Sequence, residues 1–145
     1  MRSLLIIGII LLLGVLAVFL LGNKDTLKER KTIQIGKSKL SAEVADTMIK
    51  QVRGLSGRAS LSEDEGMLFV YQSPQMLSFW MKDMRFSIDI IWIDENKTIV
   101  SILSDISPDT FPQTFAPPTP AQYVLEVQAG WALTHGIVAG DRLLW

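Results

Sequence analysis

Residues 79–94 read FWMKDMRFSIDIIWID, and this stretch indicates the fold class. In a β-strand, Asp89 shares one face with Ile91 and Ile93, whereas Ile90 and Trp92 point to the other face. A carboxylate flanked by apolar residues on both faces is expected to be at least partly buried, and it must then find a cation or several hydrogen-bond donors. The sequence therefore predicts a strand with an acid drawn into the interior.

Similar short runs, rich in β-branched and aromatic residues, lie on both sides of this strand. They predict two strands within residues 32–46 with a turn at Gly36-Lys37, and further strands at residues 67–71, 77–82, 88–93, 98–103, 121–128 and 141–144. Short helices are expected after Thr47 and around residues 131–134. The connections are too short for parallel crossovers. We predict a mainly β domain, a small sandwich or barrel with one or two short helices.

Five of the six prolines lie between Pro108 and Pro120. Such a segment cannot join the centre of a sheet, because proline lacks the backbone donor. It is either an extended arm packed on the domain through Phe111 and Phe115 or a mobile loop. We favour the packed arm, because two aromatic side chains in a free loop would be exposed.

An apolar run precedes the domain. Residues 4–21 are eighteen consecutive uncharged positions, which span ~27 Å as a helix and match the apolar thickness of a bilayer. The end of the run lacks the small-residue pattern of a cleaved signal peptide. We predict a transmembrane anchor (1–22), a linker (23–31) and one globular domain (32–145). Lys and Arg counts on the two flanks leave the orientation of this single-pass anchor open.

Composition excludes several classes of site and partner. The chain has no cysteine and one histidine, His135, so thiolate chemistry and His-cluster metal sites are excluded, and we expect no metal and no cofactor. His135 is expected to cap a short helix. From residue 32 onward there are nine Lys and Arg against thirteen Asp and Glu, a net charge of −4. An acidic domain is a poor polyanion binder, so nucleic acid is not expected as a partner.

The candidate site begins with Asp89, for which Arg53, Arg58 and Lys82 are possible partners. On the preceding strand Trp80 and Lys82 share a face, and an indole beside charges suits stacking on a sugar or another flat polar ligand. The alternatives are that Asp89 is purely structural, and that Trp80 is a core residue whose neighbour Lys82 reaches out to solvent.

Glu126 lies in Tyr123-Val124-Leu125-Glu126-Val127, on the face opposite the three alternate apolar residues. That position is typical of a solvated strand residue. Asp89 and Glu126 could nevertheless form the paired carboxylates of a glycoside-cleaving site.

Several short motifs follow one another in order: Ala45-Asp46-Thr47, Arg53-Gly54-Leu55 with Arg58, GMLFVY (66–71), FWMK (79–82), IDII (88–91), VLE (124–126) and Gly140-Asp141. This series, from about residue 35 to 143, resembles the prokaryotic family called domain of unknown function 192. The resemblance implies a β-sandwich-like domain, commonly behind a signal peptide or anchor, which favours an extracytoplasmic placement. The positions that match the family pattern are Thr47, Arg53, Gly54, Trp80, Lys82, Asp89 and Glu126.

Two departures from the family pattern concern charge and backbone. Asp83 stands where an Asn usually follows the Lys, and Ser87 stands where a Pro usually precedes the Ile-Asp pair. The first adds negative charge beside Lys82, which disfavours an anion there. The family implies no established activity.

Three functional hypotheses follow. The first is a membrane-anchored extracytoplasmic module that binds a small polar molecule or saccharide, with a pocket formed by Arg53, Trp80, Lys82, Asp89 and Glu126. The second is an envelope polysaccharide or peptide hydrolase with Asp89 and Glu126 as acid and base. The third is a structural interaction module without a pocket, whose protein partners the sequence does not identify.

Overall fold

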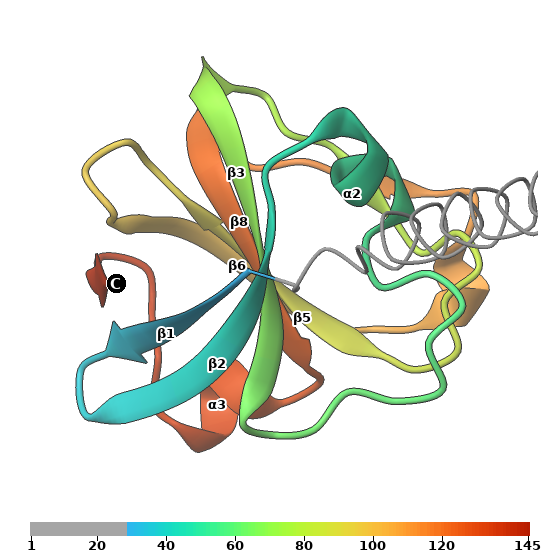
Figure 1. The fold of residues 1–145 in the computed structure, drawn as a ribbon, viewed down its shortest axis with the longest axis horizontal. Helices are drawn as coiled ribbons and strands as arrows, with labels where there is room; N and C mark the ends of the chain where they lie inside the picture. Colours follow the sequence, from blue (N-terminus) through green and yellow to red (C-terminus); the bar gives the residue numbers. More distant parts are fainter. Residues whose placement is uncertain (1–28) are drawn as a thin grey trace, which may run out of the picture.

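The computed structural model describes residues 29–145, which form one mainly β domain (Figure 1). Its elements in chain order are β1 (Arg30–Ile35), β2 (Ser38–Ala45), α2 (Met48–Arg53), β3 (Glu65–Gln75), β4 (Phe79–Trp80), β5 (Ile88–Ile93), β6 (Ile99–Ile106), the 3₁₀ helix η1 (Pro108–Thr110), β7 (Thr114–Phe115), β8 (Ala121–Gln128), α3 (Trp131–Thr134) and β9 (Leu143–Leu144). The predicted anchor lies outside the described residues. Within residues 29–145, none of the helices has the length and apolar character needed to cross a bilayer.

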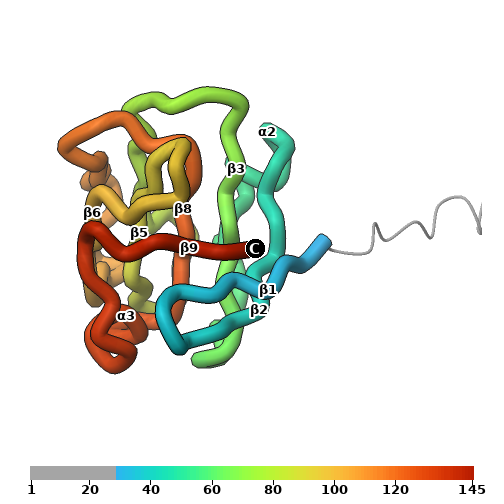
Figure 2. The backbone as a smooth tube through the Cα atoms, turned by 90° about the vertical axis from the view of Figure 1, so that its left-hand side faces the viewer, coloured from blue at the N-terminus to red at the C-terminus, as the bar shows by residue number. Residues whose placement is uncertain are grey.

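The main sheet has seven strands in the order β6-β5-β8-β3-β2-β1-β9. Neighbouring strands are antiparallel except β2 and β3, which are parallel. The expectation that the connections are too short for a parallel crossover is wrong at this point, because residues 46–64, which include α2, join β2 to β3. The sheet curls until its two edges approach each other: Thr98 bridges Arg142, and the Leu143 N–H donates to the Lys97 carbonyl at 2.9 Å. In Figure 2, β9 crosses the front of the molecule between β6 and β1. The predicted β class is confirmed, with the sheet curled into a half-barrel.

Both faces of β5 are buried, as the alternation of its residues predicted. Ile91 and Ile93 belong to one apolar core, whereas Ile90 and Trp92 belong to a second core on the other face. The indole N–H of Trp92 donates to the Leu77 carbonyl at 2.9 Å, which satisfies its polar group inside the second core. A central sheet with two cores follows directly from this residue pattern.

The predicted helix after Thr47 forms, but its apolar residues do not pack. Thr47 caps α2 by accepting a hydrogen bond from the Lys50 N–H at 3.4 Å. Met48 is 79% exposed and Val52 is 76% exposed, whereas the buried Leu55 lies beyond the end of the helix. The helix is instead joined to the sheet by Gln51, whose side-chain amide donates to the carbonyls of Ala45 and Val70.

The proline-rich segment is a packed arm, as predicted. Its strand β7 pairs with β4 in a separate two-stranded sheet, with Phe115 opposite Phe79. Phe115 packs against the second core, and the ring of Phe111 meets the Trp80 ring edge-on at 5.9 Å. The arm therefore supports β4 from outside. The predicted strand 77–82 is reduced to the two residues of β4.

Candidate functional site

Asp89 is a structural residue in this fold. It is 0% exposed, and its carboxylate accepts three backbone hydrogen bonds, each at 2.9 Å: Oδ1 from the N–H groups of Asp105 and Gly130, and Oδ2 from that of Ala132. Asp105 lies at an irregularity in the β5–β6 pairing and has a positive φ. Asp89 thus joins the end of β6 to the start of α3. The expectation that Arg53, Arg58 or Lys82 would form an ion pair with Asp89 is wrong.

Asp89 and Glu126 lie on opposite faces of the sheet. In the β5–β8 register Asp89 is opposite Val127, whereas Glu126 is opposite Ile90. Residues opposite each other in a sheet point to the same face, so Asp89 points into the first core and Glu126 into the second. The two carboxylates therefore do not open into one cleft.

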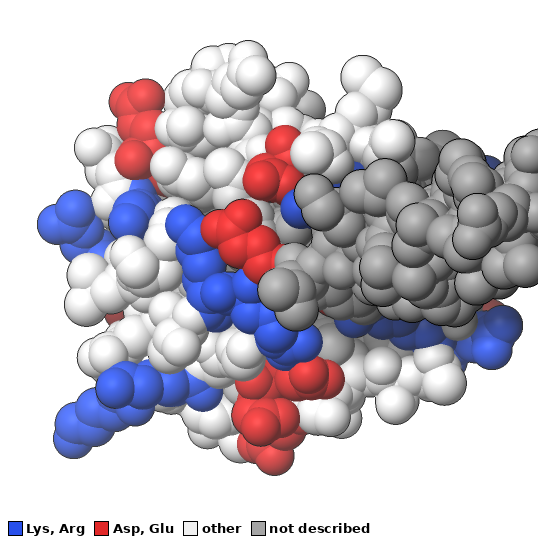
Figure 3. All heavy atoms as spheres, viewed as in Figure 1, with Lys and Arg blue, Asp and Glu red and all other residues white. Residues whose placement is uncertain are grey.

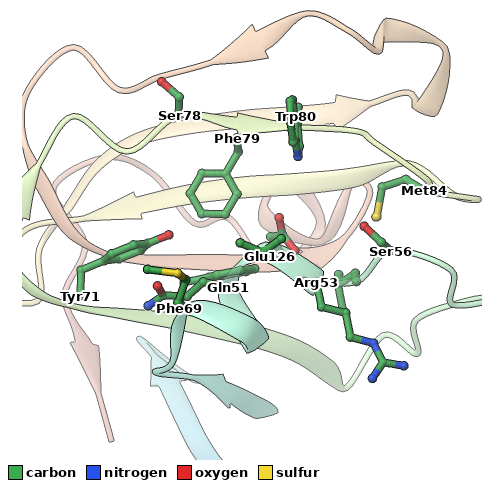
Figure 4. Close-up of a pocket in the computed structure, with 14 residues that line it drawn as sticks. Gln51, Arg53, Ser56, Phe69, Tyr71, Ser78, Phe79, Trp80, Met84 and Glu126 are labelled. Carbon is green, nitrogen blue, oxygen red and sulfur yellow. The ribbon is translucent and has the colours of Figure 1, made fainter.

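A cavity of about 300 Å³ lies on the Glu126 side of the sheet, between α2, β3 and β4. Figure 4 shows Phe79 and Trp80 on one side of it, Tyr71 and Gln51 on the other, and Glu126 between them. The residues that line it come from three parts of the chain: Met48, Gln51, Val52, Arg53, Gly54, Leu55, Ser56, Phe69, Tyr71, Ser78, Phe79, Trp80, Met84 and Glu126.

Glu126 contributes a buried carboxyl group to this cavity. Its exposed fraction is 5%, and its Oε2 has no hydrogen-bond partner among the described residues. Burial raises the pKa of the Glu126 carboxyl from 4.5 to about 8, against a smaller opposing effect of the Arg58 guanidinium. Arg58 itself is ion-paired with Glu43 at 2.7 Å. The prediction that Glu126 is solvated is wrong, because α2 and β4 cover this face of β8.

Aromatic side chains form part of the cavity wall. Phe69 and Phe79 meet edge to face with their centroids 4.9 Å apart. Burial, and then the nearby Glu126, raise the pKa of the Tyr71 hydroxyl. Trp80 is 50% exposed at the rim, so the alternative that it is a core residue is wrong. The Lys82 ammonium lies 5.8 Å from the centroid of the Trp80 ring, next to the rim but outside the lining.

The structure thus brings together three of the five predicted site residues. Arg53, Trp80 and Glu126 line the cavity, Lys82 lies beside it, and Asp89 is excluded from it. Sequence reasoning missed the aromatic walls, because Phe69 and Tyr71 read as ordinary strand residues. The alternation along GMLFVY places both on one face of β3, which is the signal that was available.

The single histidine of the chain lies at the end of α3. His135 caps α3 as expected: its backbone N–H donates to the Trp131 carbonyl, and its ring stacks on that of Trp131 at 4.4 Å. Within residues 29–145, His, Asp and Glu side chains form no group of three that could hold a metal ion.

On the part of the surface in Figure 3 that described residues form, basic and acidic side chains are interspersed, with no large single-sign patch.

Comparison with known proteins identifies the family. The family model DUF192, described as "Uncharacterized ACR", matches residues 31–145. The chain belongs to the DUF192 family. This DUF192 chain is 30% identical over 105 residues to a UPF0127 protein of Thermococcus gammatolerans and 28% identical over 103 residues to one of Thermococcus kodakarensis. Each match covers 71% of this chain but only 65% and 63%, respectively, of the two relatives.

Two solved structures share the DUF192 fold. A candidate transcription regulator of Sinorhizobium meliloti superimposes with a TM-score of 0.77 at 26% identity, over 81% of this chain and 94% of that one. A protein of unknown function from Novosphingobium aromaticivorans gives a TM-score of 0.76 at 26% identity, over 83% of this chain and 89% of that one. The similarity extends over most of the described domain.

Proposed function

We propose that this DUF192 protein is a membrane-anchored, extracytoplasmic module that binds a small polar molecule in the Glu126 cavity. The observation that carries the proposal is a carboxyl oxygen without a hydrogen-bond partner in the described structure, on a side chain that lines an aromatic-walled cavity of about 300 Å³. A concave, mostly apolar site with a few polar groups is the usual form of a small-molecule site.

The energetics of Glu126 support binding over a purely structural role. Burial of a polar group without a partner costs roughly 1–3 kcal/mol. Asp89 shows the structural solution in the same sheet, because three backbone donors satisfy its carboxylate. Glu126 Oε2 lacks such donors among residues 29–145, so a ligand that supplies one would recover part of that cost.

The other two hypotheses fit the geometry less well. A glycosidase pair needs two carboxyl groups on opposite sides of one substrate, and Asp89 is buried on the far face from Glu126. A structural module without a pocket does not account for the cavity. The similarity to a candidate transcription regulator does not favour DNA binding by this domain, because the domain is acidic and the charges on its surface are mixed.

The binding proposal is tested with the full chain in lipid nanodiscs and a set of small polar compounds that covers cations, anions and neutral molecules. Saturation-transfer NMR reports which compounds bind, and we expect at least one class to bind with a millimolar or better Kd. Replacing Glu126 by Leu keeps a side chain of similar size but removes the carboxyl group, and it should weaken that binding by about tenfold because the carboxyl contact is lost.

The matched control is Glu63→Leu, which changes an exposed acid outside the cavity lining and should leave binding unchanged. Absence of binding by every class, or equal weakening by both variants, would contradict a Glu126 site.

The membrane placement rests on the apolar run at residues 4–21 and on the family resemblance. Protease added to intact cells should digest the domain, and lysis should not increase the digested fraction. A cytoplasmic marker protein serves as the control, since it should be digested only after lysis. A domain protected until lysis would overturn the extracytoplasmic placement.

A further inference from the structure

We infer that the ligand of the Glu126 cavity carries a protonated amine, for which Glu126 is the counter-ion. The inference deepens the proposed function and rests on it. It follows from the charge, the walls and the size of the cavity.

Within residues 29–145, the Glu126 carboxyl forms no ion pair with a basic side chain. Among residues 29–145, the basic group with an electrostatic effect on this carboxyl is Arg58, which is ion-paired with Glu43 at 2.7 Å. Arg53 lines the cavity but is exposed, and Figure 4 shows its guanidinium turned away from Glu126. A ligand ammonium would supply the missing charge and also an N–H donor for Oε2.

Either carboxyl oxygen can make this contact. The terminal torsion of a Glu side chain has a broad, two-fold energy profile, so rotation exchanges the two oxygens at small cost. Figure 4 shows the Glu126 side chain between Phe79 and Tyr71.

The walls also favour a cation. Phe69, Tyr71, Phe79 and Trp80 line the cavity, and the faces of aromatic rings attract ammonium groups, more strongly when water is excluded. An anion would meet the Glu126 carboxyl and the Tyr71 hydroxyl, whereas the basic residue of the lining within residues 29–145, Arg53, turns its guanidinium away from Glu126 (Figure 4). A volume of about 300 Å³ accommodates an amine with several carbon atoms, whose alkyl part would lie against the phenyl rings.

Amine binding should release a proton. Because the pKa of Glu126 is raised to about 8, its carboxyl is mostly protonated near neutral pH. An ammonium ligand favours the ionised form, so the carboxyl O–H bond breaks and its proton passes to solvent, roughly one per bound amine near neutral pH. The charged and titratable groups around it are Tyr71 from β3, Arg53 from α2, and the Arg58–Glu43 pair.

The test compares n-butylammonium, 1-butanol and butyrate, which share one alkyl chain and differ in charge. Saturation-transfer titrations of the full chain in zwitterionic nanodiscs give the three Kd values. Proton release is measured with a pH electrode in a dilute buffer that itself contains no amine. We expect butylammonium to bind at least about tenfold more tightly than 1-butanol, and more tightly as the pH rises toward the pKa of Glu126.

Glu126→Gln keeps the shape of the side chain but cannot ionise. It should reduce butylammonium affinity about tenfold, to that of 1-butanol, and abolish proton release, whereas Glu63→Gln should change neither. Equal or tighter binding of butanol or butyrate, with no proton release, overturns the amine and leaves the cavity as a binding site. Absence of binding by all three compounds overturns the amine inference, and the wider compound set then decides on the site itself.

Discussion

Replacing Asp89 by Asn should lower the free energy of unfolding by about 4 kcal/mol, without any involvement of a ligand. The carboxylate accepts hydrogen bonds from the backbone N–H groups of Asp105, Gly130 and Ala132. An asparagine keeps one acceptor oxygen but turns an NH₂ group toward a backbone N–H, and it removes the charge that strengthens all three bonds. The hydrogen bonds that hold the end of β6 and the start of α3 to Asp89 on β5 should therefore weaken.

The measurement is urea unfolding of the full chain in nanodiscs, followed by tryptophan fluorescence. Asp64→Asn provides the matched control, because Asp64 is exposed and its substitution should change stability by less than about 0.5 kcal/mol. If Asp89→Asn lowers the free energy of unfolding by less than about 1 kcal/mol, the three hydrogen bonds to the backbone do not contribute the stability that we assign to them.

The ligand-free protein should lose stability as the pH rises from below 4.5 to above 8, by up to about 5 kcal/mol relative to Glu126→Gln. Glu126 has a folded-state pKa of about 8, raised by burial from 4.5. Between these two values the unfolded chain releases the proton while the folded domain keeps it. The folded state therefore binds more protons, and its stability falls until the carboxyl ionises in both states.

Urea unfolding at a series of pH values checks this, with wild type and Glu126→Gln compared at each pH. Taking the difference cancels the titration of every other group, so that only Glu126 contributes. A difference that stays constant from acid to alkaline pH would show that Glu126 finds a partner or water in solution, and would remove the main support for the cavity as a ligand site.

The contrast between these two acids shows how far local sequence could lead. The alternation in IDIIWI correctly placed Asp89 on the face of Ile91 and Ile93 and predicted its burial. The same rule placed Glu126 opposite Leu125 and Val127, which is also correct, but it assumed that this face meets water. Periodicity reports which residues share a face and carries no information on what covers that face.

The sequence by itself determined the β class, the positions of most strands, the short helix after Thr47 and the DUF192 family, because these depend on local periodicity and on short motifs. The tertiary structure alone decided which carboxyl is satisfied by backbone donors and which has an oxygen without a hydrogen-bond partner among residues 29–145. That outcome depends on the register between strands and on the packing of α2 and β4 over β8, from which both are separated by forty residues or more in the chain. Such long-range packing determines which hydrogen-bond donors reach a buried acid and whether solvent does. It therefore gave Asp89 backbone donors and placed Glu126 in the lining of a cavity.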